Sequence, residues 1–340
     1  MKTPDWLADL LQKNDVTDIC INGTQDSFVD RGAGMERLTH PAWPGVEIRA
    51  WVVDQLSKAG RSWDAKHPFA DTFLTSGHRL HAVFPPVSGE APAVSLRRTA
   101  LCPQNPSIGA SWKAQRGYDL LKKAVQDHES ILIAGATGSG KTTLLNALIA
   151  EADPAERILL LEDVPELNPL HPHALRLGAR PATADGVGEV SLRTLVRQSL
   201  RMRPDRLVIG ECRGPEVLDL LQALNTGHRG TLATVHAASA RDALRRLELL
   251  CLLSPGQPLA TSVLRDLIVS GIQWIVHIER VASGRRISEI ARVAGREGDT
   301  ILLRAMLNLG HGYACDLERT ALADPFGGRR TREVPSSRVS

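Results

Sequence analysis

The second part of the chain alternates between uniformly apolar runs and amphipathic segments. The apolar runs are ILIAG (131–135), ILLLED (158–163), RLVIGE (206–211) and TLATV (231–235). Runs of this length that are apolar at nearly every position are typical of strands buried on both faces. Between them, residues 191–202 and 215–227 place leucine and valine at helical spacing, which predicts helices. Strands that alternate with helices predict a parallel sheet with helices on both faces.

The first hundred residues show a mixture of short strands and helices, which predicts an α+β domain. The predicted elements are an amphipathic helix capped at Thr3 and Pro4, a strand at 16–23, a hairpin around Gly32 and Gly34, a helix at 45–60, and strands at 78–86 and 92–98.

A stretch rich in proline, asparagine and glycine, CPQNPSIGA (102–110), separates the two patterns and is interpreted as a linker. Late in the chain, WIVHIER and RRISEIARV predict a β-hairpin, and the basic tail after it favours disorder. The expected organisation is an N-terminal domain at 1–101, a linker at 102–116, a second domain at 117–315 and a flexible tail at 316–340.

Composition narrows the possible functions. The chain has 340 residues, of which 43% are apolar and 23% charged, ordinary values for a soluble globular protein. A net charge of +3 is too small to indicate nucleic acid or an anionic membrane as the main partner. No apolar run approaches the ~18 residues that span a bilayer, and the N-terminus does not resemble a signal peptide. The five cysteines form no C-x-x-C pair, which argues against a zinc module or disulfide framework and favours a reducing cytosol.

The segment GATGSGKT (135–142) fits the phosphate-loop pattern G-x-x-x-x-G-K-S/T, and it lies between a predicted strand and a predicted helix. Glycines let backbone amides converge on phosphate oxygens, and the helix N-terminus adds partial positive charge. Lys141 is expected to reach the β- and γ-phosphates, and Thr142 to place its hydroxyl on Mg²⁺. The candidate nucleotide-binding residues are Gly135, Ala136, Thr137, Gly138, Ser139, Gly140, Lys141, Thr142 and Thr143.

The other apolar runs end in residues that carry chemistry. ILLL is followed by Glu162 and Asp163, LVIG by Glu211, and TLATV by His236, while His228 precedes that last run. Because ligands of parallel α/β sheets bind beyond the carboxyl ends of the strands, these groups are expected near the phosphate loop. His236 is interpreted as a polar sensor near the γ-phosphate. For His228, a functional role and a role in the core or as a cap both remain open.

Arginines form a second group of candidates. Four of them lie on one predicted helical face or just after it, namely Arg193, Arg197, Arg201 and Arg203. This pattern fits either a solvated stripe with local ion pairs or charge stabilisation of a phosphate, in the manner of arginine fingers. Arg79, Arg97 and Arg98 lie on strand-like pieces before the linker, where a closing domain could bring them to the nucleotide.

Together, these residues resemble the superfamily of type II and type IV secretion and pilus-assembly ATPases. Besides the phosphate loop, LEDVPEL (161–167) matches its acidic box, RMRPDRLVIGECRGPE (201–216) its Walker B region and NTGHRGTLATVHA (225–237) its histidine box. GHRLHAVFPP, SLRR and RDALRRLE resemble the CpaF branch, which serves Tad pili. The chain lacks the tetracysteine module of the type II export motors. Its departures from the family pattern, at Cys212, Pro215 and Arg229, concern fine tuning rather than chemistry.

The resemblance implies ATP and Mg²⁺ as cofactors. It implies that Glu162 orients or deprotonates the attacking water and that Glu211 is the Walker B acid near the metal. Thr142, Glu211 and Asp163 are the candidate metal ligands. His228 and His236 would couple the state of the phosphates to movement. The arginines that would reach the nucleotide, from the same or a neighbouring subunit, are Arg79, Arg97, Arg98 and Arg203.

The implied fold is an α/β RecA-like P-loop NTPase domain with a parallel-containing sheet, preceded by a smaller α+β, PAS-like domain. The implied function is that of a homohexameric, cytoplasmic ATPase that drives pilus assembly or secretion through a platform protein of the inner membrane. A nucleic-acid translocase and a non-catalytic nucleotide-gated scaffold are the alternatives. An aromatic content of 4% gives few stacking residues, so no direct nucleic-acid binding is expected. A GTPase is disfavoured because no N-K-x-D motif occurs.

Overall fold

The residues that the structure describes form two β-sheets, each with its own helices; the first sheet has one hydrophobic core, and the second has one on each face. The structure is a computed structural model that describes residues 1–32, 34–60, 63, 68–99, 107–180, 188–254, 259–281 and 284–309. The two parts are described separately below.

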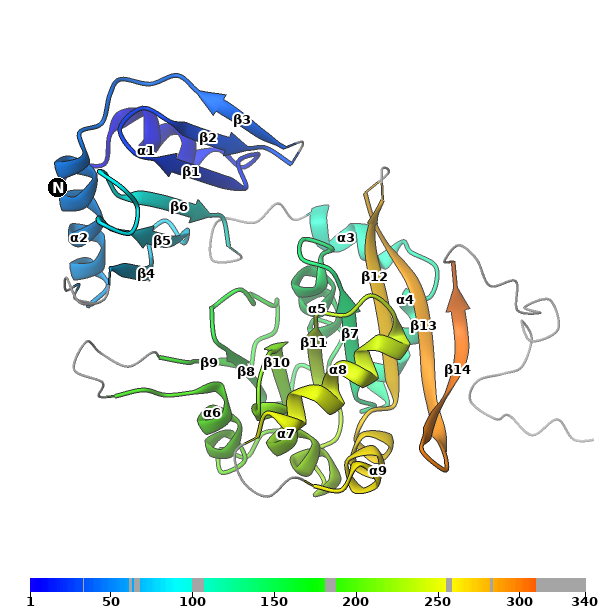
Figure 1. Cartoon of the computed structure of the whole chain (residues 1–340). Helices are drawn as coiled ribbons and strands as arrows, with labels where there is room; N and C mark the ends of the chain where they lie inside the picture. Colours follow the sequence, from blue (N-terminus) through cyan, green and yellow to red (C-terminus); the bar gives the residue numbers. More distant parts are fainter. Residues whose placement is uncertain are drawn as a thin grey trace, which may run out of the picture. The chain divides into compact units, whose positions relative to one another are not determined.

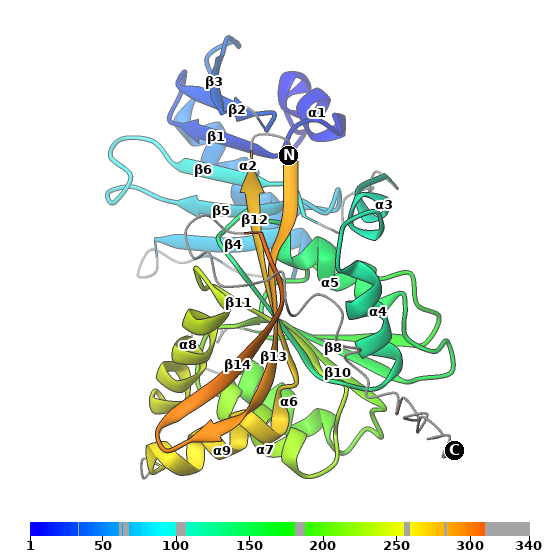
Figure 2. The same cartoon turned by 90° about the vertical axis from the view of Figure 1, so that its right-hand side faces the viewer.

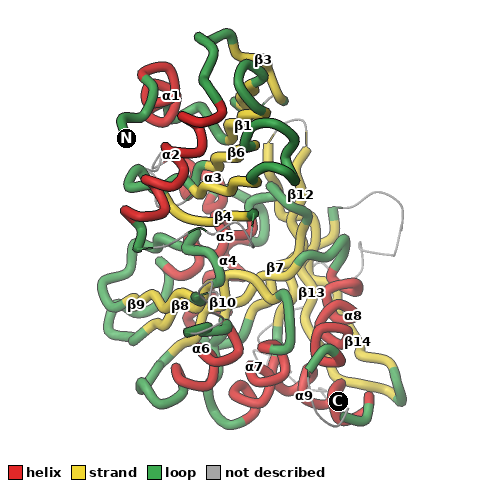
Figure 3. Tube along the Cα trace, turned by 60° about the vertical axis from the view of Figure 1, so that its left-hand side comes forward, coloured by secondary structure: helices red, strands yellow, loops and turns green. Residues whose placement is uncertain are grey.

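The N-terminal part contains a six-stranded antiparallel sheet of order β3-β2-β1-β6-β5-β4. Its elements are α1 (Asp5–Gln12), β1 (Asp18–Asn22), β2 (Ser27–Asp30), β3 (Met35–Leu38), α2 (Gly45–Lys58), β4 (Phe69–Phe73), β5 (Arg79–Val83) and β6 (Ala93–Arg97). Buried residues alternate along β1, β5 and β6, and one face of the sheet shares a core with α1 and α2 (Figure 3). The α+β prediction for this part is confirmed.

Two details of the N-terminal part differ from the sequence pattern. Strand β4 was not predicted, because its sequence FADTF carries only a weak apolar alternation. The expected cap at Thr3 is also absent, since α1 begins after Pro4 without a side-chain cap. The Thr3 hydroxyl instead accepts a hydrogen bond of 3.0 Å from the indole of Trp51 in α2.

The second part contains an eight-stranded sheet of order β14-β13-β12-β7-β11-β10-β8-β9 (Figure 1). Its elements are α3 (Ser107–Lys113), α4 (Tyr118–Gln126), β7 (Ile131–Gly135), α5 (Lys141–Ile149), β8 (Ile158–Glu162), β9 (Ala174–Gly178), α6 (Leu192–Ser199), β10 (Arg206–Cys212), α7 (Glu216–Asn225), β11 (Leu232–Val235), α8 (Ala240–Leu252), α9 (Thr261–Gly271), β12 (Trp274–Val281), β13 (Gly284–Glu297) and β14 (Thr300–Asn308). Strands β12 to β9 are parallel, and β13 and β14 continue the sheet in antiparallel pairing.

Helices cover both faces of this sheet, as the uniformly apolar strands predicted. Leu132 and Ala134 of β7 share a core with α6, α7, α8 and α9, whereas Ile131 and Ile133 share a core with α3, α4 and α5. In Figure 2, α8 and α4 lie on opposite sides of the long strands. The four strands predicted from apolar runs, the two helices between them and the late hairpin are all present.

The expected linker at 102–116 contains helix α3, whose Trp112 is 1% exposed and belongs to a core. Residues 102–106 of that linker and the expected tail at 316–340 lie outside the described residues. The predicted domain boundaries stay predictions. Of the helices that the structure describes, none has both the length and the apolar character needed to cross a bilayer.

Candidate nucleotide site

Two glycines between the end of β7 and the start of α5 leave no room for a side chain. A Cβ atom on Gly135 would lie 2.6 Å from both the Ile278 carbonyl oxygen and the Ser139 hydroxyl. Gly140 has a φ of +100°, and a Cβ there would lie 2.7 Å from the Arg285 side chain. The tight turn that aims backbone amides at a ligand therefore depends on these glycines, as the phosphate-loop pattern predicted.

Lys141, the first residue of α5, is folded back over this loop. Its Nζ donates to the carbonyl oxygens of Gly135 and Ala136, both at 2.9 Å, and the side chain is 8% exposed. The pKa of Lys141 is lowered, chiefly because burial disfavours its charged form. A phosphate oxyanion is a stronger partner for an ammonium group than a carbonyl oxygen. The arrangement therefore fits a cation that exchanges its loop carbonyls for phosphate.

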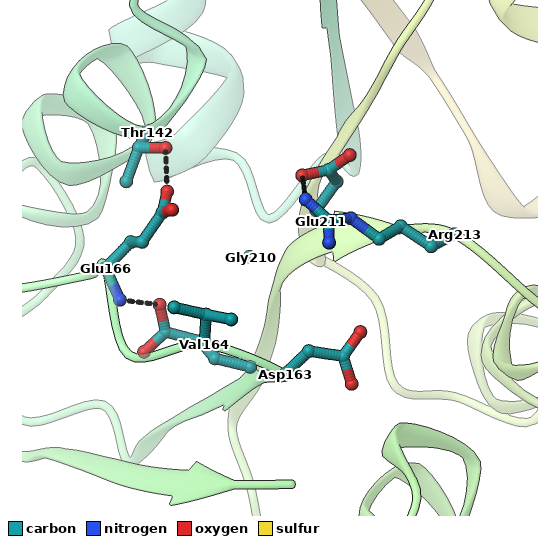
Figure 4. A pocket seen from close by; sticks show the side chains of 8 residues that line it. Thr142, Asp163, Val164, Glu166, Gly210, Glu211 and Arg213 are labelled. Atoms are coloured by element: carbon teal, nitrogen blue, oxygen red, sulfur yellow. Dashed lines mark hydrogen bonds and ion pairs between the residues drawn. The ribbon is translucent and has the colours of Figure 1, made fainter. Parts of the chain in front are cut away.

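A carboxylate faces the next residue of α5. The Thr142 hydroxyl donates to Oε2 of Glu166 at 3.2 Å, and Figure 4 shows the Glu166 side chain directed at Thr142. Glu166 was not among the candidates from the sequence, although it lies in the acidic box LEDVPEL. The pocket at this edge of the sheet is lined by Thr142, Glu162, Asp163, Val164, Glu166, Gly210, Glu211 and Arg213.

A β-bulge in β10 determines where Glu211 points. Ile209 pairs with Ala233 of β11, but Cys212, three residues later, pairs with Val235, two residues later. Ile209 and Cys212 consequently face the same hydrophobic core, and the side chain of Glu211 between them lies outside that core. Bulges of this kind re-aim side chains next to active sites. The bulge thus lets a buried strand deliver a carboxylate to the pocket.

His236, after β11, connects the lysine to this carboxylate. Its Nδ1 lies 3.3 Å from Nζ of Lys141, and its Nε2 lies 2.9 Å from Oε1 of Glu211. Because an ammonium group only donates and a carboxylate only accepts, the neutral ring accepts at Nδ1 and donates at Nε2. Burial, followed by repulsion from Lys141, lowers the pKa of His236 and favours this neutral form. The other oxygen of Glu211 binds Arg213 at 2.6 Å.

Glu162 lines the same pocket, and its carboxylate is held by groups of the turn that follows β8. Its carboxylate is buried, and Oε1 accepts the backbone amides of Glu166 at 2.8 Å and Leu167 at 2.7 Å. Its Oε2 lies 3.3 Å from Nε of Arg176 in β9. Burial raises the pKa of Glu162 to about 7. Of the two acidic-box glutamates, Glu166 is therefore the one that reaches the phosphate-loop helix.

His228 and Arg203 do not join the site of their own chain. His228 lies before β11 and Arg203 before β10, whereas the phosphate loop and His236 follow parallel strands of the same sheet. Both residues therefore lie at the N-terminal ends of the parallel strands, opposite the ends that carry the phosphate loop and His236. Arg193 and Arg197 of α6 each bind one oxygen of Asp219 in α7 at 2.6 Å. Of the two interpretations of the arginine stripe, these contacts match the one with local ion pairs.

The three arginines of the N-terminal sheet have partners within that sheet's domain. Arg79 binds Asp71 at 3.1 Å, and Arg97 binds Asp18 at 2.8 Å. Arg98 donates to the segment that follows α1. That they reach a nucleotide, in the same or another subunit, stays a prediction.

The candidate metal ligands belong to a sparse set of donors. Among the described residues, no three His, Cys, Asp or Glu side chains are grouped to hold a metal ion. Mg²⁺ bound to ATP takes one or two protein oxygens and completes its shell with phosphates and water. Thr142 and Glu211 line the same pocket and suit that role. Asp163 lines it too, but its carboxylate points away from Thr142 in Figure 4.

This fold and site define a P-loop ATP hydrolase. The model of the Type II/IV secretion system protein family matches residues 65–280, and the chain belongs to this family. A Mycobacterium tuberculosis protein named for conjugal transfer is 39% identical, with 86% of this chain and 85% of that protein covered. The type IV secretion system protein PtlH of Bordetella pertussis is 35% identical, with 82% and 91% covered.

Solved structures agree on the fold. The Legionella pneumophila ATPase DotB superimposes with a TM-score of 0.61 at 20% sequence identity, covering 84% of this chain and 79% of that one. The family assignment expected from the phosphate loop, acidic box and histidine box is thereby confirmed.

Proposed function

We propose that this ATPase powers a type IV secretion or conjugative transfer machine, as a ring of identical subunits docked through protein partners on the cytoplasmic face of the inner membrane. The observation that carries the enzymatic part is the contact of 3.2 Å between Thr142 and Glu166, one residue along from the buried Lys141. The names of the relatives, which refer to type IV secretion and conjugal transfer, support the machine. Service to Tad pili stays a prediction.

The residues divide the work in this proposal. Lys141 and the amides at the start of α5 would hold the phosphates, and Thr142 and Glu211 would hold Mg²⁺, whose charge offsets that of the phosphates. Glu166 would accept the proton of the attacking water, because it is the carboxylate that already lies against Thr142. His236 contacts both Lys141 and Glu211. When Lys141 leaves the carbonyls of its loop, His236 would pass this change on to Glu211.

Two variants test the enzymatic part. Lys141→Ala removes a phosphate partner and should weaken ATP binding as well as turnover. Glu166→Gln preserves shape but removes the proton acceptor, so kcat should fall by about 10²–10⁴ with ATP affinity nearly unchanged. Phosphate release and binding of a fluorescent ATP analogue measure both quantities. A Glu166→Gln protein with wild-type turnover would refute its role.

The machine is tested in the source cells. Deletion of the gene should abolish conjugative transfer or protein secretion, and a plasmid-borne wild-type copy, but not Lys141→Ala, should restore it. Unaffected transfer and secretion after deletion would refute this assignment.

The ring is tested by mixing subunits. If Arg97 completes a neighbour's site, inactive Lys141→Ala and Arg97→Ala proteins should regain part of the ATPase activity in mixed rings. Mixed rings without any recovery would exclude this sharing.

A further inference from the structure

The turn after β8 is held by the buried carboxyl group of Glu162 and by the partly exposed Arg176. Glu162 is 1% exposed, and its Oε1 holds the amides of Glu166 and Leu167 at 2.8 and 2.7 Å. Arg176, from β9, lies with its Nε 3.3 Å from Oε2 of Glu162 and also donates to the Leu167 carbonyl oxygen. The amide and the carbonyl of Leu167 are therefore both bound, one by each member of the pair.

The anchored turn presents the carboxylate that faces the phosphate-loop helix. The amide of Glu166 is bound by Glu162, while the side chain of the same residue accepts from Thr142 at 3.2 Å. A shift of this amide would move the carboxylate with it. Misplacing a reacting group by about 1 Å can cost about 10²-fold in rate. The position of Glu166 thus depends on a group that does not itself face Thr142.

We propose that Glu162 and Arg176 are positioning residues that fix Glu166 opposite Thr142 and thereby set the rate of hydrolysis rather than the affinity for nucleotide. The inference rests on the proposed role of Glu166. It assigns Glu162 a different function from direct water activation, because its Oε1 is already occupied by two backbone amides. The groups proposed to hold the phosphates, Lys141 and its loop, are not anchored by this pair.

Three substitutions separate positioning from chemistry. Glu162→Ala removes the amide acceptor and should lower kcat by about 10–100-fold, with KM and ATP affinity within about threefold of wild type. Glu162→Gln retains a carbonyl oxygen that can accept both amides, so it should recover most of the lost kcat. Arg176→Ala frees the Leu167 carbonyl and should lower kcat in the same direction. A chemical base would instead leave Glu162→Gln as inactive as Glu162→Ala, which would overturn the proposal.

A double mutant identifies the route of the effect. If Glu162 acts through Glu166, adding Glu162→Ala to Glu166→Gln should cause no further loss of kcat, because residues that serve one step are not additive. Losses that multiply would show an independent role and overturn the proposal. If Glu166→Gln alone retains wild-type turnover, the proposed function of Glu166 fails, and this result is read separately from the Glu162 variants.

A matched pair controls for loss of stability. Glu156 binds the buried Arg206 at 2.9 Å. Arg206 is the first residue of β10, so this pair lies at the strand ends opposite the phosphate loop. Glu156→Ala should lower the thermal midpoint as Glu162→Ala does, with kcat close to wild type for the folded protein. If both variants lower kcat equally at a temperature where each is folded, the effect is structural and the positioning role is refuted.

Discussion

Glu162→Gln should change how stability depends on pH, because this substitution removes the titration of a buried carboxyl group. Burial raises the pKa of Glu162 to about 7, from the ordinary value of 4.5. The amides of Glu166 and Leu167 and the guanidinium of Arg176 oppose this rise, whereas the charge of Glu166 adds to it. The folded protein consequently retains a proton over a pH range in which the unfolded chain has already released it.

The sign and size of the effect follow from this difference. A group whose pKa is raised by folding stabilises the folded state fully below its unfolded value, near 4.5, and this stabilisation is lost as the pH rises to about 7. Because one pH unit between the two values is worth about 1.4 kcal/mol, the loss amounts to about 3 kcal/mol. Glutamine cannot titrate. Relative to Glu162→Gln, the wild type should therefore lose about 2–3 kcal/mol of unfolding free energy between pH 5 and pH 8.

Urea unfolding followed by tryptophan fluorescence, at several pH values for both proteins, measures this difference. Ile158→Val is a suitable control, because Ile158 is fully buried on the same strand and does not ionise. It should lower stability by about 1 kcal/mol at every pH. If the difference in unfolding free energy between wild type and Glu162→Gln is also the same at every pH, the reasoning is refuted and Glu162 ionises as an exposed glutamate does.

Three further predictions concern the loop and the strand ends. Gly140→Ala should lower stability by about 1–2 kcal/mol, because its φ of +100° and the Arg285 side chain 2.7 Å from the new Cβ both oppose it; a thermal melt and ATP binding test this, and an unchanged melting temperature would contradict it. His236→Ala should keep folding and ATP binding within about threefold but uncouple hydrolysis from transfer, which parallel ATPase and transfer assays measure; an unfolded variant would instead indicate a core histidine. Glu211→Gln should reduce turnover by about 10²–10⁴ and raise the Mg²⁺ concentration needed for half-maximal activity, and a Mg²⁺ titration that overlays the wild type would exclude it from the metal site.

The sequence identified those parts of the fold in which burial dictates the residues. The strands β7, β8 and β11 are buried at every position, so their sequences are apolar throughout and easily recognised. The edge strand β9 is only partly buried, with the sequence ALRLG, and was missed because exposure relaxes the pattern. Helix α3 was missed because the proline and asparagine just before it indicated a linker, although Trp112 anchors it in a core.

The candidate site likewise has features that the sequence shows and features that only the structure shows. The phosphate loop could be found because backbone geometry fixes its glycines at set spacings, so that the chemistry is written in consecutive residues. The bulge in β10 could not, since nothing in LVIGEC marks an extra residue and only the pairing with β11 shows it. The choice between Glu162 and Glu166 was equally inaccessible. The end of a strand in the sequence predicts roughly where a residue lies. The conformation of the turn that follows determines which of the two carboxylates contacts Thr142.

The two histidines that bracket β11 differ for a reason that the strand itself supplies. Its neighbours β7 and β10 run parallel to it, so only the residue after β11 meets the phosphate loop and the β10 bulge. His236 lies there, between a group that can only donate and a group that can only accept. If phosphate took Lys141 from its loop carbonyls, as proposed, Nδ1 of His236 would lose its donor, and the restraint on Glu211 through Nε2 would change with it. His228 has no such pair of partners, so its removal should leave this link intact.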